Sequence, residues 1–213
     1  MMRLSLIKRK RASKFVLKNA PKEFAEALSR LNTSSVAIDL GANIGAVSVI
    51  LADTGSQVFS FEPNPRAFGK MLANCKNYSK IIPYQLAAGV NNRMTQLFLH
   101  KDSLTSRKDL SQSSSLSRFK NNVSHDTFVW IFEIDFNAFI SQIGYVDLIK
   151  VDIEGYEIEL MNHMLDNQTL DHVGAVFVET HENKNPLLVE PTLKLKNRIS
   201  KSPYAEKVFF NWH

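Results

Sequence analysis

Two short stretches near the N-terminus contain residues that could hold a cofactor with an adenosine moiety. Residues 36–45 have the sequence VAIDLGANIG, and residues 58–65 have the sequence VFSFEPNP. The pattern predicts a buried strand, a glycine turn that opens a helix, and a second strand that ends in an acid, Glu62. A carboxylate at that point can accept hydrogen bonds from ribose hydroxyls, and it follows Asp39 by 23 positions. Glycines in the turn let the backbone approach a ligand without an intervening Cβ.

The glycine turn also limits which cofactor fits. A nicotinamide dinucleotide site requires G-x-G-x-x-G, whose second glycine lets the backbone approach the pyrophosphate. Here Asn43 occupies that second place between Gly41 and Gly45, and no third glycine follows. The pattern favours a cofactor without a pyrophosphate, S-adenosylmethionine, over a plain strand-turn-helix connection whose glycines only permit the turn. The predicted cofactor-binding residues are Asp39, Gly41, Ala42, Asn43, Gly45, Glu62, Pro63 and Asn64.

Three motifs together resemble one known family. Residues 39–45 (DLGANIG), 61–65 (FEPNP) and 147–157 (DLIKVDIEGYE) are similar to the FkbM family of S-adenosylmethionine-dependent methyltransferases. The third motif is the most specific, and the resemblance spans about residues 34–182. It implies O-methylation of a hydroxyl on a sugar, a glycolipid or another natural product, and it leaves the acceptor and the oligomeric state unspecified.

Residues at the end of a later strand could carry out the chemistry. Methyl transfer from a sulfonium needs an aligned acceptor oxygen and a group that takes its proton. Lys150, Asp152 and Glu154 alternate along the end of a strand, so they share one face for as far as the strand continues. We predict Asp152 or Glu154 as the acceptor-side base or hydroxyl orienter, with Lys150 as charge partner. The alternative is a structural ion pair between Lys150 and Asp152, with Glu154 only starting a helix.

A second pair with the same spacing, Glu179 and His181, follows the strand expected beside the first. His181 could take the hydroxyl proton, oriented by Glu179 or Glu182, or it could be a satisfied polar residue at the rim of the site. With Asp152 and Glu154, this pair could also assemble a site for a divalent metal ion, which some sugar O-methyltransferases use to bind a diol. The spacing matches no specific metal motif, so no metal ligand is predicted.

Strands rich in Val, Ile, Leu, Phe and Tyr alternate with helical segments along the chain. The alternation predicts an α/β fold with the Rossmann-like, doubly wound, mostly parallel sheet of a class I methyltransferase. The expected strands are 36–40, 57–62, 81–86, 146–152, 173–180 and 207–211. The expected helices are 21–31, 44–53, 65–76, 136–142, 156–165 and 191–200.

The end of the chain departs from the family pattern. Methyltransferase sheets of this type normally finish with an antiparallel hairpin, yet only residues 207–212 resemble a final strand. We expect either a sheet that is one strand short or a contribution from residues 187–189.

One internal segment is too polar to add to the core. Residues 101–127 contain eight serines and lie between two expected sheet additions, 95–100 and 128–135. A long loop of this kind is either a lid over the acceptor or a loose insertion.

The positive charge is concentrated at the N-terminus. Residues 1–30 hold nine Lys and Arg against two Glu, a net charge of +7, whereas the whole chain carries +5. We therefore expect a basic arm over 1–30 and a nearly neutral methyltransferase domain over 31–213, with no nucleic-acid-binding face. Residues 1–18 could lie on an anionic membrane surface or meet a partner, or could form a solvated helix.

Other features of the sequence indicate where in the cell the protein works and which alternative functions fit it less well. The single cysteine excludes an intrachain disulfide, and the N-terminus lacks the apolar region of a secretory signal, so we expect a cytoplasmic protein. Where nucleic-acid amino-methyltransferases carry an Asn/Asp-Pro-Pro-aromatic motif, residues 151–155 read VDIEG. Two functions remain as alternatives to the predicted methyltransferase. One is a non-catalytic cofactor-binding module that docks through its basic arm, and the other is a Rossmann oxidoreductase, which Asn43 disfavours.

Overall fold

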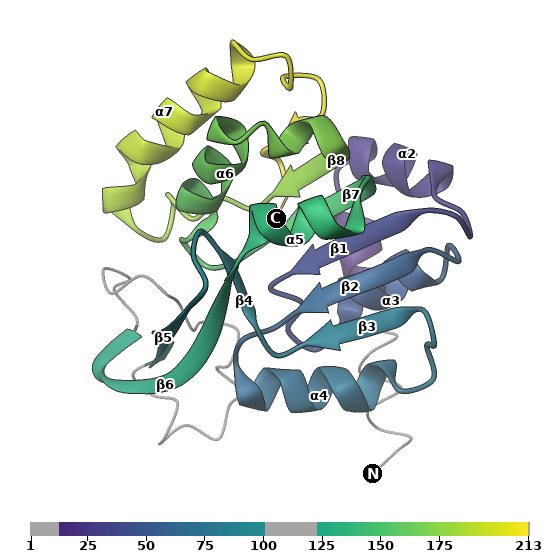
Figure 1. The fold of residues 1–213 in the computed structure, drawn as a ribbon, viewed down its shortest axis with the longest axis horizontal. Coiled ribbons are helices and arrows are strands. Elements are labelled where there is room, and N and C mark those ends of the chain that lie inside the picture. The colour runs from purple at the N-terminus through teal and green to yellow at the C-terminus, as the bar shows by residue number, and fades with distance from the viewer. Residues whose placement is uncertain (1–12, 101–122, 213) are drawn as a thin grey trace.

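A six-stranded parallel sheet forms the centre of the protein (Figure 1). The computed structural model describes residues 13–100 and 123–212. The strands follow the order β3-β2-β1-β7-β8-β9, and every neighbouring pair is parallel. Their bounds are β1 (Val36–Leu40), β2 (Gln57–Phe61), β3 (Ile81–Tyr84), β7 (Val146–Val151), β8 (Val173–Val178) and β9 (Val208–Phe209). This arrangement confirms the predicted α/β, Rossmann-like fold.

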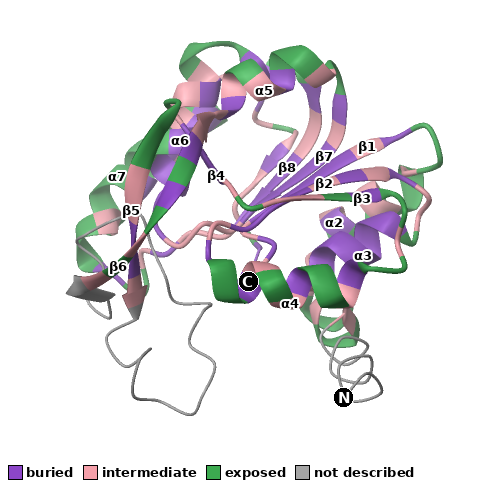
Figure 2. Ribbon diagram, turned by 60° about the horizontal axis from the view of Figure 1, so that its bottom comes forward, coloured by how far each residue is buried: buried purple, intermediate pink, exposed green. Residues whose placement is uncertain are grey.

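Helices cover both faces of this sheet because its strands are apolar on both sides. The helices are α2 (Lys22–Arg30), α3 (Ala46–Ala52), α4 (Pro65–Cys75), α5 (Phe136–Ile143), α6 (Glu157–Asp166) and α7 (Val189–Ser200), with short 3-10 helices η2 (Thr169–His172) and η3 (Pro186–Leu188). Residues of α2, α3 and α4 share one core cluster with Ala37 and Val58, whereas α5, α6 and α7 pack with Ile38 and Leu40 in a second cluster. Figure 2 shows the buried strands between these layers.

The strand order reverses beside β1. The chain runs outward from β1 through β2 to β3, and later returns to place β7 on the other side of β1. Ligands of open parallel sheets bind at the carboxyl ends of the strands at such a reversal. The predicted cofactor residues follow β1 and β2, and the predicted catalytic residues lie at the ends of β7 and β8.

The C-terminal end of the sheet differs from the usual hairpin. β9 pairs in parallel with β8, and residues 187–189 belong to η3 and the start of α7. Of the two expectations, the sheet that is one strand short is therefore correct for the part of the chain that the structure describes. Pro186 sets the first turn of η3, and Asn185 caps it by accepting a hydrogen bond from the Leu187 amide, so this segment is helical.

The two expected sheet additions form a separate, three-stranded sheet instead of extending the main one. It consists of β4 (Ala87–Gly89), β5 (Arg93–His100) and β6 (Val123–Asp135), with β6 in the middle. Its own small core contains Ala87, Leu97 and Ile131. In Figure 1 it lies on the side toward which the arrowheads of β1, β2 and β3 point. The small sheet therefore borders the site.

Two of the sequence expectations fall partly on residues outside the described ranges. Residues 101–122 of the expected polar loop and residues 1–12 of the expected basic arm lie there. Residues 123–127, assigned to the loop from their polarity, belong to β6, and Val123 pairs with His100 of β5 beyond an irregularity in the register. Within the described part of the expected arm, Phe24 on α2 is fully buried and contacts Phe177 and Trp212 edge-on. None of the helices in the described ranges has the length and apolar character of a membrane span.

Candidate active site

The glycine turn after β1 brings the ends of β1 and β7 into close contact. Gly41 has φ +70°, and a Cβ there would lie 1.8 Å from the backbone oxygen of Asp152. The amides of Gly41 and Ala42 both donate to the Phe61 carbonyl, at 3.0 and 2.9 Å. Gly45, with φ +82°, then caps α3. These contacts place the turn between the ends of β2 and β7.

Glu62 is held at the end of β2 by two backbone amides. Its carboxylate accepts hydrogen bonds from the Asn43 amide and the Asn64 amide, both at 2.8 Å, and the residue is 7% exposed. Burial raises the pKa of Glu62 to about 7, although the two amides and the Lys150 charge lower it. A buried carboxylate with this environment is a candidate ligand-binding group.

The residues around Glu62 complete one side of the site. Asn43 has φ +51°, and its buried side-chain oxygen has no hydrogen-bond partner. Pro63 follows Glu62, and the side chain of Asn64 caps α4 by accepting from the amides of Arg66 and Ala67. Asn64 thus supports the segment that carries Glu62, whereas Asn43 keeps a buried acceptor oxygen without a hydrogen-bond partner.

Asp39 lies deeper than the other predicted cofactor residues. It is fully buried, and its carboxylate accepts a 2.6 Å hydrogen bond from Ser48 on α3. Ser60 on β2 donates in turn to Ser48. Asp39 thereby connects β1, α3 and β2 below the glycine turn.

Lys150 lies between the two halves of the site. Its ammonium donates to the carbonyls of Leu40 and Gly41, at 3.2 and 3.0 Å, and lies 3.4 Å from Asp39 Oδ1 and from Asp152 Oδ2. Burial lowers the pKa of Lys150, but the two carboxylates outweigh burial and leave the pKa above its ordinary value. The ammonium therefore remains charged and joins the end of β1 to the end of β7.

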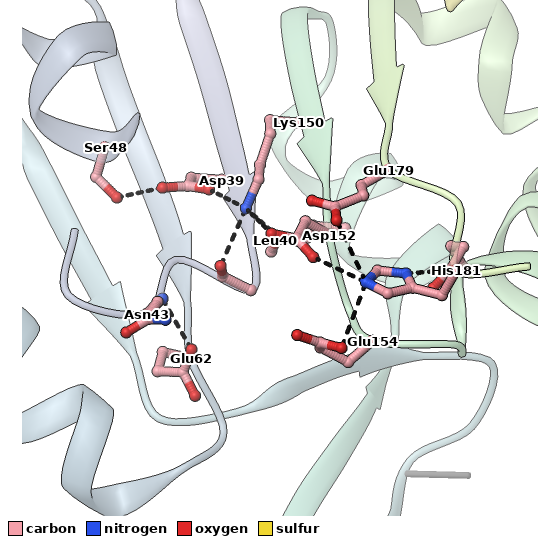
Figure 3. Close-up of polar contacts among 12 residues, drawn as sticks. Asp39, Leu40, Asn43, Ser48, Glu62, Lys150, Asp152, Glu154, Glu179 and His181 are labelled. Carbon is pink, nitrogen blue, oxygen red and sulfur yellow. Dashed lines mark hydrogen bonds and ion pairs between the residues drawn. The ribbon is translucent and has the colours of Figure 1, made fainter. Parts of the chain in front are cut away.

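On the other side of Lys150, three carboxylates converge on one histidine nitrogen (Figure 3). His181 Nε2 lies 3.3 Å from Glu154, 3.6 Å from Glu179 and 3.7 Å from Asp152. None of these approaches is a hydrogen bond, and Nε2 has no hydrogen-bond partner although His181 is 2% exposed. The structure thus brings together four of the five predicted catalytic residues, and the fifth, Lys150, contacts Asp152.

The other ring nitrogen is held by a residue that sequence reasoning missed. Nδ1 of His181 lies 3.0 Å from Glu157, whose second oxygen accepts a 2.7 Å hydrogen bond from the Gly155 amide. Glu157 is fully buried on α6, and it orients His181 in place of Glu182, which pairs with Lys196 at 2.8 Å. Burial lowers the pKa of His181, but Glu157 and its acidic neighbours raise it above the ordinary value.

Acidic neighbours also affect Glu179. Burial and the charge of Asp152 raise the pKa of Glu179, whereas His181 and Lys184 lower it. The net pKa is above the ordinary value, although Lys184 lies only 3.3 Å from the Glu179 carboxylate. The cluster therefore carries more negative charge than its cations balance.

A second buried acid supports the loop that carries Glu154. Glu133 on β6 is fully buried and accepts hydrogen bonds from the Tyr156 hydroxyl at 3.0 Å, from Arg93 at 2.8 Å and from the Val90 amide at 3.0 Å. The network ties the small sheet to the segment before α6. Its signal in the sequence is a glutamate at the strand position that alternates with buried Ile131.

Figure 3 shows the two halves of the site on either side of Lys150. Asn43 and Glu62 lie on one side, and the His181 cluster lies on the other. The arrangement can hold a polar ligand against the glycine turn and present carboxylate and imidazole groups to a second molecule beside it.

Comparisons with known proteins identify the family. The family model of the methyltransferase FkbM domain matches residues 39–197. The chain is 28% identical over 178 residues to hexuronic acid methyltransferase AglP of Haloferax volcanii, covering 82% of this chain and 69% of that protein. It is 24% identical over 175 residues to methyltransferase 1 of Beauveria bassiana, covering 75% and 70%.

A solved structure, precorrin-6y C5,15-methyltransferase from Geobacter metallireducens, aligns with a TM-score of 0.43 and 11% identity, covering 82% of this chain and 68% of that one.

The family match spans most of the chain and includes the glycine turn, Glu62 and the His181 cluster. This protein therefore belongs to the FkbM methyltransferase family and is a methyltransferase.

Proposed function

We propose that this protein transfers a methyl group from S-adenosylmethionine to a hydroxyl of a sugar or of a sugar-containing lipid. The observation that carries the proposal is the position of the buried Glu62 carboxylate beside the glycine turn, next to a cluster of acids around His181. One half of the site suits a ribose-bearing cofactor, and the other half suits a hydroxyl that must lose a proton.

The residues after β1 and β2 fit S-adenosylmethionine. Glu62 would accept hydrogen bonds from the ribose hydroxyls, because its carboxylate has capacity beyond the two amides that it already binds. The unpartnered side-chain oxygen of Asn43 would accept from the amino group at the amino-acid end. The turn at Gly41 allows the close backbone approach that a side chain would block.

When bound, S-adenosylmethionine supplies an electrophilic methyl group on a positively charged sulfur. Asp152 and Glu154 would orient the acceptor hydroxyl behind that methyl group, in line with the breaking bond. As the acceptor oxygen forms its bond to carbon and the carbon–sulfur bond breaks, the hydroxyl proton would pass to the Asp152 carboxylate. Lys150 would keep that carboxylate in place through its 3.4 Å ion pair.

The acceptor class is supported by a relative. AglP is named as a hexuronic acid methyltransferase, which supports an acidic sugar as the acceptor of this chain. Several polar groups at the His181 cluster suit an acceptor rich in hydroxyls. The cationic Lys184 at its rim suits an acidic sugar.

A binding and turnover experiment tests the proposal. Calorimetry should detect binding of S-adenosylmethionine and S-adenosylhomocysteine but not of NADH, and Glu62→Ala should weaken both. Asp152→Asn should spare cofactor binding and remove methyl transfer, measured by release of S-adenosylhomocysteine with hexuronic acid-containing acceptors. The control Glu190→Gln removes an exposed carboxylate on α7 that pairs with Lys194.

The result can also contradict the proposal. Tighter binding of NADH would favour the oxidoreductase, and cofactor binding without turnover on any sugar acceptor would favour a non-catalytic module. Full turnover by Asp152→Asn would show that the proton goes elsewhere.

A further inference from the structure

We infer that Asp152, Glu154 and His181 bind a divalent metal ion beside the cofactor site. One ligand atom from each residue lies within 4.8 Å of the other two, so a single ion can reach all three. The role assigned to the ion rests on the proposed methyl transfer, whereas its binding does not.

The main observation is the buried, unsatisfied nitrogen of His181. Glu157 can only accept a hydrogen bond when ionised, so its 3.0 Å contact places the imidazole hydrogen on Nδ1. In neutral histidine, Nε2 then carries a lone pair that points toward the oxygens of Asp152 and Glu154. Acceptors that face acceptors repel one another, and a cation among them converts the repulsion into three attractive contacts.

The groups behind the cluster resemble the support that metal sites require. A histidine that binds a metal donates its other nitrogen to a carboxylate, which fixes the ring orientation. Glu157 provides that carboxylate, and it is itself fixed by the Gly155 amide. Both Glu157 and His181 are almost completely buried, so the ring cannot turn to find another partner.

Each of the two acids places one oxygen near Nε2 of His181. Asp152 directs Oδ2 toward Lys150 and Oδ1 toward His181. Glu154 has φ +58°, a strained conformation for a residue with a side chain, and its carboxylate lies 3.3 Å from the same nitrogen. Glu179 adds a third negative charge at 3.6 Å from the nitrogen. Lys150 contacts the Asp152 oxygen that faces away from His181, whereas Lys184 contacts the Glu179 oxygen that faces Nε2. Three carboxylates thus share these two ammonium groups.

The ligand types indicate which ion would bind. Two carboxylates and one imidazole form a mostly oxygen-based set, which suits Mg²⁺ or Mn²⁺. Both ions prefer about six ligands, so about three positions would remain for water and for oxygens of the acceptor. An acceptor hydroxyl on the ion would be oriented and made more acidic. With one Asp152 oxygen on the ion and the other beside Lys150, the hydroxyl proton would pass to Glu179, the acid of the cluster that is not a ligand, in place of Asp152.

Manganese binding tests the inference directly. Titrating the 213-residue protein with Mn²⁺ should abolish the electron paramagnetic resonance signal of the free ion until about one Mn²⁺ per chain is bound, and Mg²⁺ should compete. Asp152→Asn and Glu154→Gln should each weaken Mn²⁺ binding at least about tenfold, and Glu157→Gln, which changes only a support, about 10- to 100-fold. Glu190→Gln should bind as the wild type does. Circular dichroism of each variant confirms that it is folded.

The outcomes separate this inference from the proposed function. An undiminished signal of free Mn²⁺ with the wild-type protein would overturn the metal site, as would unchanged binding in both Asp152→Asn and Glu154→Gln. If S-adenosylhomocysteine binds and Mn²⁺ does not, the metal site fails while the cofactor site of the proposed function stands. If Mn²⁺ binds in the expected manner and S-adenosylhomocysteine does not, the metal site stands and the proposed function fails.

Discussion

Binding of the cofactor should depend on pH through Glu62. Burial raises the pKa of Glu62 to about 7, so this acid holds its proton at pH values where exposed glutamates are ionised. Only the ionised carboxylate can accept from two backbone amides and from ribose hydroxyls together. We therefore expect affinity for S-adenosylhomocysteine to rise as the pH rises through 7.

The size of the effect follows from the pKa. With a pKa of about 7, about one tenth of the protein carries ionised Glu62 at pH 6 and about nine tenths at pH 8. The dissociation constant should therefore fall about tenfold between these pH values, equivalent to about 1.4 kcal/mol. The charged groups that act on Glu62 are Lys150, which lowers its pKa, and Asp39, which raises it.

Calorimetry at constant ionic strength, at pH 6, 7 and 8, would measure this slope. Glu62→Gln keeps the size of the side chain but cannot ionise, so it should bind more weakly and with little pH dependence. Glu190→Gln should retain the wild-type slope. Equal affinity at pH 6 and 8, or a tenfold slope that persists in Glu62→Gln, would refute the assignment of Glu62 as the ribose ligand.

Three further substitutions and one control, measured by chemical denaturation, test the contacts that support the site. Gly41→Ala, whose Cβ would lie 1.8 Å from a backbone oxygen, should lower the free energy of unfolding by about 3 kcal/mol or more. The control Gly69→Ala, whose Cβ would enter open space on α4, should raise it by about 0.5–1 kcal/mol. Equal effects of the two substitutions would contradict the close approach at Gly41. Ser48→Ala removes the 2.6 Å hydrogen bond to buried Asp39 and should lower the free energy of unfolding by about 1–3 kcal/mol. An unchanged denaturation midpoint would show that another group replaces this hydrogen bond to Asp39. Phe24→Ala should cost about 3–5 kcal/mol, and a cost below about 1 kcal/mol would mean that α2 is not part of the core.

The features that could be predicted from sequence depend on local signals. The turn at Gly41, the acid Glu62 and the apolar runs of the strands each lie within about ten consecutive residues. Their periodicity and spacing therefore indicate the sheet, and the family resemblance adds the reaction. The sequence also indicated that Asp152, Glu154 and His181 would meet, because parallel strands end at one edge.

Contacts between distant elements left no comparable signal. Glu157 occupies the first turn of a helix, where a glutamate is ordinary, and its burial beneath His181 depends on how α6 packs against the end of β8. The separate small sheet was missed because β6 begins within a polar, serine-rich segment. The final strand was ambiguous because β9 has only two residues, too few for a periodic pattern.

The position of β1 in the sheet has a consequence during synthesis of the chain. β1 pairs with β2, which follows it closely, but its other partner, β7, is 111 residues further along, as in the pairing of Ala37 with Leu148. At translation rates of about 5–20 residues per second, one edge of β1 stays unpaired for on the order of 5 to 20 s. A nascent or truncated chain that ends before β7 would present this apolar strand, with Ile38 and Leu40, as a template for association with other chains.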